Sequence, residues 1–220
     1  TAEIAVKAAL TGHLVLSTIH TNNSAGVVPR LIDMGVDPYL IAPTLQLAIA
    51  QRLVRRICPH SGKKVKVEGS IKELIAHEFH DLPEKYRSLV PTGEYVLFAE
   101  ATSGCASGTK GRVAVMEAIE VNQEIQNLIL KSASEDEIQE AARRNGYVSM
   151  KEDAIIKALD HSIPFEEVST LGGDLLVSDE AEEEAELLKE GEKSVLESVT
   201  DIEPEEEESE PVDNPEPLTV

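Results

Sequence analysis

The first region of the chain alternates short apolar stretches with turn residues. Residues 2–10 have helical propensity, and Gly12 supplies a stop for that helix. The predicted apolar face of the helix consists of Ile4, Ala5, Ala8 and Ala9. Residues 13–18 (HLVLST) are short, apolar and bounded by a turn, which predicts a buried strand.

Two further helices are predicted next. Asn22 or Asn23 caps the first of them, and Gly35 ends it. Asp37 caps the second, with a proline at its first turn, and we expect this helix to continue to about Ala50.

Two prolines fall inside these predicted helices. An interior proline costs about 3 kcal/mol or more unless a kink accommodates it, so at Pro29 and Pro43 the helices either begin later or bend. Residues 53–57 predict a further strand. The order helix, strand, helix, helix, strand predicts an α/β fold with a parallel sheet.

The chain changes character after residue 57, which divides it into regions 1–57, 58–111, 112–173 and 174–220. Region 58–111 carries several lysines and glycines and a polar helix near residues 71–80, as expected of an insertion rather than a core layer. Residues 112–119 (RVAVMEAI) alternate, which predicts a half-buried strand.

Three helices follow this strand and form a small helical bundle on the sheet domain. Asn122 caps the first helix. Ser134 and Glu137 form a capping box for the second, which Gly146 closes. Residues 150–159 form the third.

The net charge of −21 belongs mainly to the last region. Residues 174–220 hold 19 acidic and two basic side chains, a net charge of −17, whereas residues 1–173 hold 22 acidic and 18 basic, a net charge of −4. We expect an acidic tail that is disordered from about residue 178, because it has too little apolar surface to offset the entropy of ordering. Such a tail repels nucleic acid, so we expect no direct nucleic-acid partner.

The composition is that of an ordinary soluble protein, with 41% hydrophobic residues. No apolar run approaches the roughly 18–20 residues that cross a bilayer, so we expect no transmembrane segment. The start lacks the features of a signal peptide, and Thr1 in place of Met indicates a truncated chain. Two cysteines are too few for a disulfide scaffold and fit a reducing compartment, so we expect a cytoplasmic location.

The stretch TGHLVLSTIHTNN (residues 11–23) carries the candidate chemistry. Ligands of parallel α/β sheets bind beyond the carboxyl ends of the strands. That rim would hold Thr18, His20, Thr21 and Asn22. An imidazole suits a phosphate site, because its charge and hydrogen bonding respond to a developing anion near neutral pH. The alternative is that these residues only cap the next helix.

Several motifs follow one another at the start of the chain. TAEIA comes first, TGH and STIHTN form a paired-histidine box, and RLIDMG and AQRLVRRIC come next. In this order and spacing they resemble the secretion ATPase superfamily, which powers type II secretion, type IV pilus assembly and DNA uptake. The resemblance covers residues 1–173.

The resemblance implies the C-terminal part of a RecA-like P-loop ATPase domain, assembled as a homohexamer that uses ATP and Mg²⁺. It also implies work on pilin-like subunits through an inner-membrane platform protein, performed by a cytoplasmic protein associated peripherally with the inner membrane. The chain contains no G-x-x-x-x-G-K-[ST] phosphate-binding loop. It also lacks the strand with an acidic end that the resemblance places before Thr1. We therefore expect this fragment alone to be inactive as an ATPase.

The family's site positions carry over residue by residue. His13 and His20 match the two histidines of the box, and we expect His20 to sense the γ-phosphate or polarise the attacking water. His13 is expected to be structural or to lie at the opposite end of the site. Arg52 would stabilise phosphoryl charge, unless it only forms a basic strand edge. The predicted nucleotide-binding residues are therefore His13, Thr18, His20, Thr21, Asn22, Gln51 and Arg52.

The insertion departs from the family at its metal site. Assembly and secretion members resemble one another in two Cys-x-x-Cys pairs that bind zinc tetrahedrally. Here Cys58 and Cys105 remain, whereas Ser61 and Thr102 occupy the other two positions. Structural zinc needs four closed ligands, so we expect no zinc, and these two cysteines are the remaining metal candidates.

The length of the insertion distinguishes branches of the superfamily. More than fifty residues separate Arg52 from Arg112, whereas retraction ATPases have almost nothing between the corresponding segments. This length favours the assembly or secretion branch. Two alternatives stay open: a retraction or DNA-uptake ATPase, and a non-catalytic family member that acts as an interaction or scaffold protein.

Overall fold

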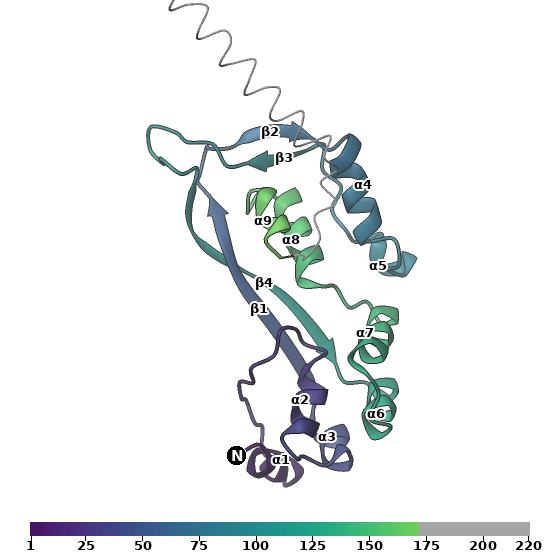
Figure 1. Cartoon of the computed structure of the whole chain (residues 1–220). Helices are drawn as coiled ribbons and strands as arrows, with labels where there is room; N and C mark the ends of the chain where they lie inside the picture. Colours follow the sequence, from purple (N-terminus) through teal and green to yellow (C-terminus); the bar gives the residue numbers. More distant parts are fainter. Residues whose placement is uncertain (172–220) are drawn as a thin grey trace, which may run out of the picture. The chain divides into compact units, whose positions relative to one another are not determined.

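A computed structural model describes residues 1–171, a mixed arrangement of helices and strands (Figure 1). The tail for which we expect disorder lies outside the described residues. The helices are α1 (Ala2–Leu10), α2 (Val27–Asp33), α3 (Pro38–Thr44), α4 (Gly69–Glu78), α5 (Glu84–Arg87), α6 (Gln123–Leu130), α7 (Glu135–Arg144), α8 (Met150–Leu159) and α9 (Glu166–Ser169). The strands are β1 (Leu47–Ile57), β2 (Lys63–Lys66), β3 (Tyr95–Phe98) and β4 (Thr109–Glu120).

The two long strands form the main ladder. β1 pairs antiparallel with β4, from Leu47 opposite Glu120 to Ile57 opposite Thr109, and the two run side by side in Figure 1. β2 and β3 form a second antiparallel pair. The strand predicted at residues 112–119 is confirmed, but the expected parallel sheet is not formed within residues 1–171. The insertion brings the chain back alongside β1 in the opposite direction, so the two alternating stretches pair as antiparallel strands.

The prediction of a buried strand at residues 13–18 is wrong for this chain. The segment has no strand pairing, and Leu14 and Leu16 are each 90% exposed. A strand is stable only when its backbone groups find partners on a neighbouring strand. Among the described residues, β1 pairs with β4 and β2 pairs with β3, and no strand pairs with this segment.

The predicted helices of the first region form, but with different limits. α2 begins at Val27 after Gly26, not at Asn22 or Asn23, so Pro29 lies in its first turn, where no amide hydrogen is needed. The later start is thus confirmed for this proline.

α3 is shorter than predicted at its C-terminal end. Asp37 caps it as expected, accepting a hydrogen bond from the Tyr39 amide at 2.9 Å. The helix stops at Thr44, directly after Pro43, because the following alternating residues pair with β4. β1 therefore begins at Leu47, and the extension of the helix to about residue 50 is wrong.

The C-terminal helices agree with the sequence patterns. Asn122 accepts the Ile125 amide hydrogen at 3.0 Å and caps α6. Ser134 and Glu137 form the predicted capping box of α7. α8 has the predicted bounds, with a second capping box formed by Ser149 and Glu152.

The described residues bury two apolar clusters. The first joins the helices of the first region to α6, α7 and the end of β4, and α1 contributes Ala2 and Val6 to it rather than Ile4, which is 73% exposed. The second joins the insertion to α8, α9 and the ladder. Its fully buried members include Leu82 and Val96 from the insertion, and Ala154, Ile155 and Ala158 from α8. The insertion therefore shares a core with the C-terminal helices.

Candidate functional site

The histidine-containing segment starts at the end of α1. The Thr11 hydroxyl donates to the Ala8 carbonyl at 2.8 Å, and its oxygen lies 3.0 Å from His13 Nδ1. His13 Nδ1 also lies 3.3 Å from the Ala8 carbonyl oxygen. The His13 side chain thus contacts the last turn of α1.

The middle of the segment is open to solvent. Thr18, His20 and Asn22 are all exposed, and none of their side chains has a hydrogen bond among the described residues. The Thr21 hydroxyl donates to the Asn23 carbonyl at 2.9 Å, which turns the chain toward α2. Hydroxyl, imidazole and amide groups can donate hydrogen bonds to phosphate oxygens, so the chemistry of these side chains suits a phosphate ligand. They include no carboxylate, the usual protein ligand of Mg²⁺.

The end of the segment is fixed by two acidic side chains. Asn23 donates its amide to Glu135 in α7 and accepts the Gly26 amide hydrogen at 2.8 Å. Ser24 is 1% exposed and makes two hydrogen bonds to Glu117 Oε1, from its amide at 2.6 Å and from its hydroxyl at 3.0 Å. The histidine-containing segment is therefore anchored at its C-terminal end, whereas the His20 side chain has no hydrogen-bond partner among the described residues.

Glu117 joins three parts of the chain. Its carboxylate is on β4 and 4% exposed, and its second oxygen accepts the Met150 amide hydrogen at 3.2 Å, at the first turn of α8. Burial raises the pKa of the nearby Tyr147 phenol, and the Glu117 charge raises it further. One buried carboxylate thus links the histidine segment, the ladder and the C-terminal helices.

Sequence reasoning missed Glu117 and Ser24. The signal for Glu117 was present, because in RVAVMEAI it lies two residues from Val115 and two from Ile119, on the side of the strand that is buried. A charged residue in an apolar row indicates a buried polar contact. Nothing in the local pattern identifies Ser24 as its partner.

Gln51 and Arg52 lie on opposite faces of the β1–β4 ladder. Glu117 lies opposite Ala50 and Val115 lies opposite Arg52, so Arg52 shares the strand face that carries Glu117. Gln51 points to the other face, with Met116 opposite it. Of this pair, Arg52 is on the side to which Ser24 is bound, and its side chain is exposed.

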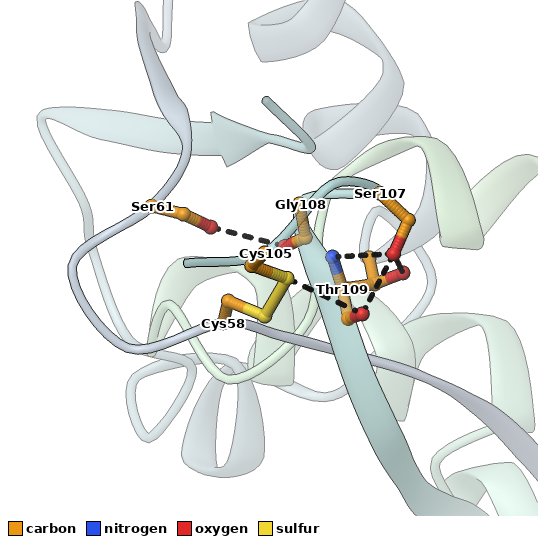
Figure 2. Close-up of a disulfide and its surroundings, with 6 residues drawn as sticks. All are labelled: Cys58, Ser61, Cys105, Ser107, Gly108 and Thr109. Carbon is orange, nitrogen blue, oxygen red and sulfur yellow. Dashed lines mark hydrogen bonds between the residues drawn. A yellow bond between two sulfur atoms is a disulfide. The ribbon is translucent and has the colours of Figure 1, made fainter. Parts of the chain in front are cut away.

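The two metal candidates are bonded to each other. Figure 2 shows the disulfide between Cys58 and Cys105, whose Cα atoms are 6.6 Å apart, and the Ser61 hydroxyl donating to the Gly108 carbonyl at 3.0 Å. Neither sulfur is a free thiol in this structure, so the two remaining metal candidates are not available as thiolate ligands here. Residues 1–171 contain no group of three or more side chains suited to a metal ion.

The chain is similar in sequence to known proteins. The family profile described as Type II/IV secretion system protein matches residues 1–170. The chain belongs to this family. It is 41% identical over 169 residues to a type II secretion system protein E of Xanthomonas campestris, 36% identical over 175 residues to the type IV pilus assembly ATPase PilB of Pseudomonas aeruginosa, and 38% identical over 174 residues to PilB of Thermus thermophilus.

This member of the secretion system protein family matches only part of each relative. The alignments cover 76%, 79% and 76% of the chain, but 28%, 29% and 18% of the three relatives, in the same order. The chain thus spans less than a third of their length. Of the helices in residues 1–171, none combines the length and apolar character required to span a membrane.

Proposed function

We propose that the chain is the C-terminal part of a hexameric cytoplasmic ATPase that powers type IV pilus assembly or type II secretion. The observation that carries the proposal is the anchored but open segment 13–23. Ser24, directly after this segment, is held by buried hydrogen bonds to Glu117, and the exposed His20 side chain remains free to contact a ligand. The family relationship supplies the class of ligand, because several relatives are named ATPases.

In this proposal the chain's own residues have separate roles. Thr18 and Asn22 donate hydrogen bonds to the phosphates, and His20 orients the attacking water or contacts the terminal phosphate. Thr21, whose hydroxyl donates to the Asn23 carbonyl, holds the turn that presents them. Arg52 stabilises negative charge from the strand face that it shares with Glu117. ATP with Mg²⁺ supplies the chemical energy, and the phosphate-binding lysine and metal-binding acid belong to the rest of the intact protein.

The proposed fold of the intact protein is RecA-like. Residues 13–18 would then find strand partners in a parallel sheet, which would cover Leu14 and Leu16. The length of the insertion supports an assembly or secretion role, and the insertion shares its buried core with α8. A platform protein of the inner membrane is the proposed partner, and the cytoplasmic face of that membrane is the proposed location.

The test is ATP turnover by the intact protein that contains this chain. We expect Mg²⁺-dependent hydrolysis, and a His20→Ala variant with kcat lowered about 100-fold, the usual minimum for loss of a group that assists proton transfer or water positioning. His77→Ala is the matched control, because this histidine is also exposed, with a side-chain exposure of 70%, and lies on α4 in the insertion.

The possible results separate the candidate functions. Equal kcat values for the two histidine variants would contradict the role of His20. No turnover by the intact wild-type protein, with folding intact, would instead favour the non-catalytic scaffold. The chain of residues 1–220 alone should show no saturable turnover.

A further inference from the structure

We propose that Cys58 and Cys105 form a reversible redox site, which a peroxide closes to the disulfide and a dithiol opens. The closed form fastens the turn at residues 101–106 to the end of β1, and the open form releases it. This inference concerns the insertion and does not depend on ATP hydrolysis.

The two sulfurs differ in accessibility. Cys58 directly follows β1 and is 4% exposed, so reagents in solution do not reach it easily. Cys105 is half-buried and lies at the end of a turn whose residues Thr102, Ser103 and Gly104 are exposed. A reagent therefore attacks the sulfur of Cys105, and Cys58 acts as the second, sheltered partner.

The disulfide is the main link of the turn to the rest of the molecule. The Thr102 and Cys105 backbones exchange two hydrogen bonds at 2.9 and 3.0 Å, and the Gly108 amide donates to the Cys105 carbonyl at 3.1 Å. Within the described part of the chain, the hydrogen bonds of residues 101–106 stay inside residues 102–108. The covalent bond to Cys58, visible in Figure 2, is what ties the turn to β1.

The hydrogen bonds and apolar contacts around the disulfide do not depend on it. The Gly108 carbonyl accepts the Cys58 amide hydrogen and the Ser61 hydroxyl hydrogen, both at 3.0 Å, so the start of β4 stays attached. β2 pairs with β3, and Leu82 and Val96 are buried against the second apolar cluster. Opening the bond therefore loosens the turn but leaves the insertion folded.

The redox steps balance in both directions. Hydrogen peroxide oxidises the Cys105 thiolate to a sulfenic acid; the Cys58 thiol then attacks that sulfur, the S–S bond forms and water leaves. In total, two thiols and one peroxide give one disulfide and two waters. In the reverse direction a dithiol thiolate attacks Cys105, Cys58 leaves and takes up a proton, and the second thiol of the reagent displaces Cys105.

The proposed cytoplasmic location makes the open form accessible. Disulfides in that compartment are rare and, where they occur, are often transient or redox-sensing. The site would thus be open in the resting cell and closed under peroxide. The assignment of the resting state rests on the proposed location, whereas the redox chemistry of the two cysteines does not depend on it.

The experiment compares one preparation of the wild-type chain after peroxide with the same preparation after dithiothreitol. Alkylation followed by mass spectrometry should find no free thiol in the first and two in the second. Hydrogen exchange of peptides covering residues 99–108 should be about ten-fold faster after reduction, because a local opening is no longer restrained. Peptides from α4 and α8 should be unchanged.

A Cys58→Ser/Cys105→Ser variant is the matched control, and its turn should exchange rapidly in both reagents. Thiols that remain open to alkylation after peroxide, or a disulfide that dithiothreitol leaves intact, would overturn the proposal. So would equal exchange of residues 99–108 in both states. Loss of protection that spreads to α4 and α8 would identify the bond as a structural cross-link instead.

Discussion

At the scale of single residues, the contacts that matter most are those of buried charged groups. Glu117 accepts three hydrogen bonds from Ser24 and Met150, groups that are distant in sequence. A carboxylate is stable in such a place only because its oxygens are satisfied, and the donors would in turn be left without partners if it were removed. The alternating pattern indicates that Glu117 faces inward, but no local rule predicts its partners.

Glu117→Ala should lower the free energy of unfolding by about 3 kcal/mol, since it leaves two buried amides and one hydroxyl without an acceptor. Urea unfolding of the chain measures this change. Glu120→Ala is the control on the same strand, because Glu120 is exposed, and its effect should stay within about 0.5 kcal/mol. Similar losses for both variants would contradict the structural role of Glu117.

At the scale of elements, local signals with their own hydrogen bonds were predicted well. The caps at Asp37 and Asn122 and the capping box at Ser134 depend on residues at most three apart, and all are present. The predictions of a strand at 13–18 and of a helix α3 that continues to about residue 50 were both wrong, because both depend on which segment pairs with which. Apolar residues favour burial, but only the available partner decides between helix, strand and exposed loop.

Gly146 shows how an element end also positions its neighbours. It follows α7 with φ +89°, and a β-carbon there would lie 2.6 Å from the ring of Tyr86 in α5. Gly35 has a similar φ of +82°, with no atom within 4 Å of a β-carbon. A substitution at either glycine therefore costs backbone strain, but only a substitution at Gly146 also causes steric overlap.

Gly35→Ala should cost about 1 kcal/mol, the strain of a left-handed conformation with a side chain. Gly146→Ala should cost about 3 kcal/mol, because the overlap with Tyr86 adds to the same strain. Thermal or urea unfolding of the two variants checks the difference. Equal losses would mean that the Tyr86 ring moves aside at little cost.

At the scale of the molecule, Arg143 ties the insertion to the C-terminal helices. Its side chain is 12% exposed, and the guanidinium donates to Asp81 and to Glu152, both at 2.5 Å at the nearest, and to the Glu78 carbonyl at 3.2 Å. Burial tends to raise the pKa of the Asp81 carboxyl, but the Arg143 hydrogen bond and charge outweigh it, so that pKa lies below its usual value. Contacts between residues more than sixty positions apart leave no trace in a single sequence, so the shared core of the insertion was not foreseen.

Arg143→Ala should lower the free energy of unfolding by about 3 kcal/mol, because it leaves the buried Glu152 without its partner. Arg144→Ala, an adjacent arginine with 58% of its side chain exposed, should cost less than about 1 kcal/mol. Urea unfolding compares the two, and an equal loss would contradict the buried network.

The pH dependence provides a second measurement of the same contact. Folding lowers the pKa of Asp81, so its ionised carboxylate adds to the free energy of unfolding. This contribution is complete above the pKa of the unfolded chain, about 3.9, and is lost as the pH falls through the pKa of the folded chain. The wild-type chain should therefore lose stability more steeply below about pH 4 than Arg143→Ala does. Parallel curves would show that Arg143 does not set the Asp81 pKa.

The open face of the ladder has a practical consequence for work with this chain. Leu47, Ile49 and Leu53 alternate along β1 and are at least half exposed, and Met116 of β4 is 42% exposed on the same side. Apolar side chains in a row on a strand pair favour contact between copies of a protein in concentrated solution. Purification of the chain by itself should therefore aim for dilute samples, and crystals should be sought with a polar substitution at Leu53.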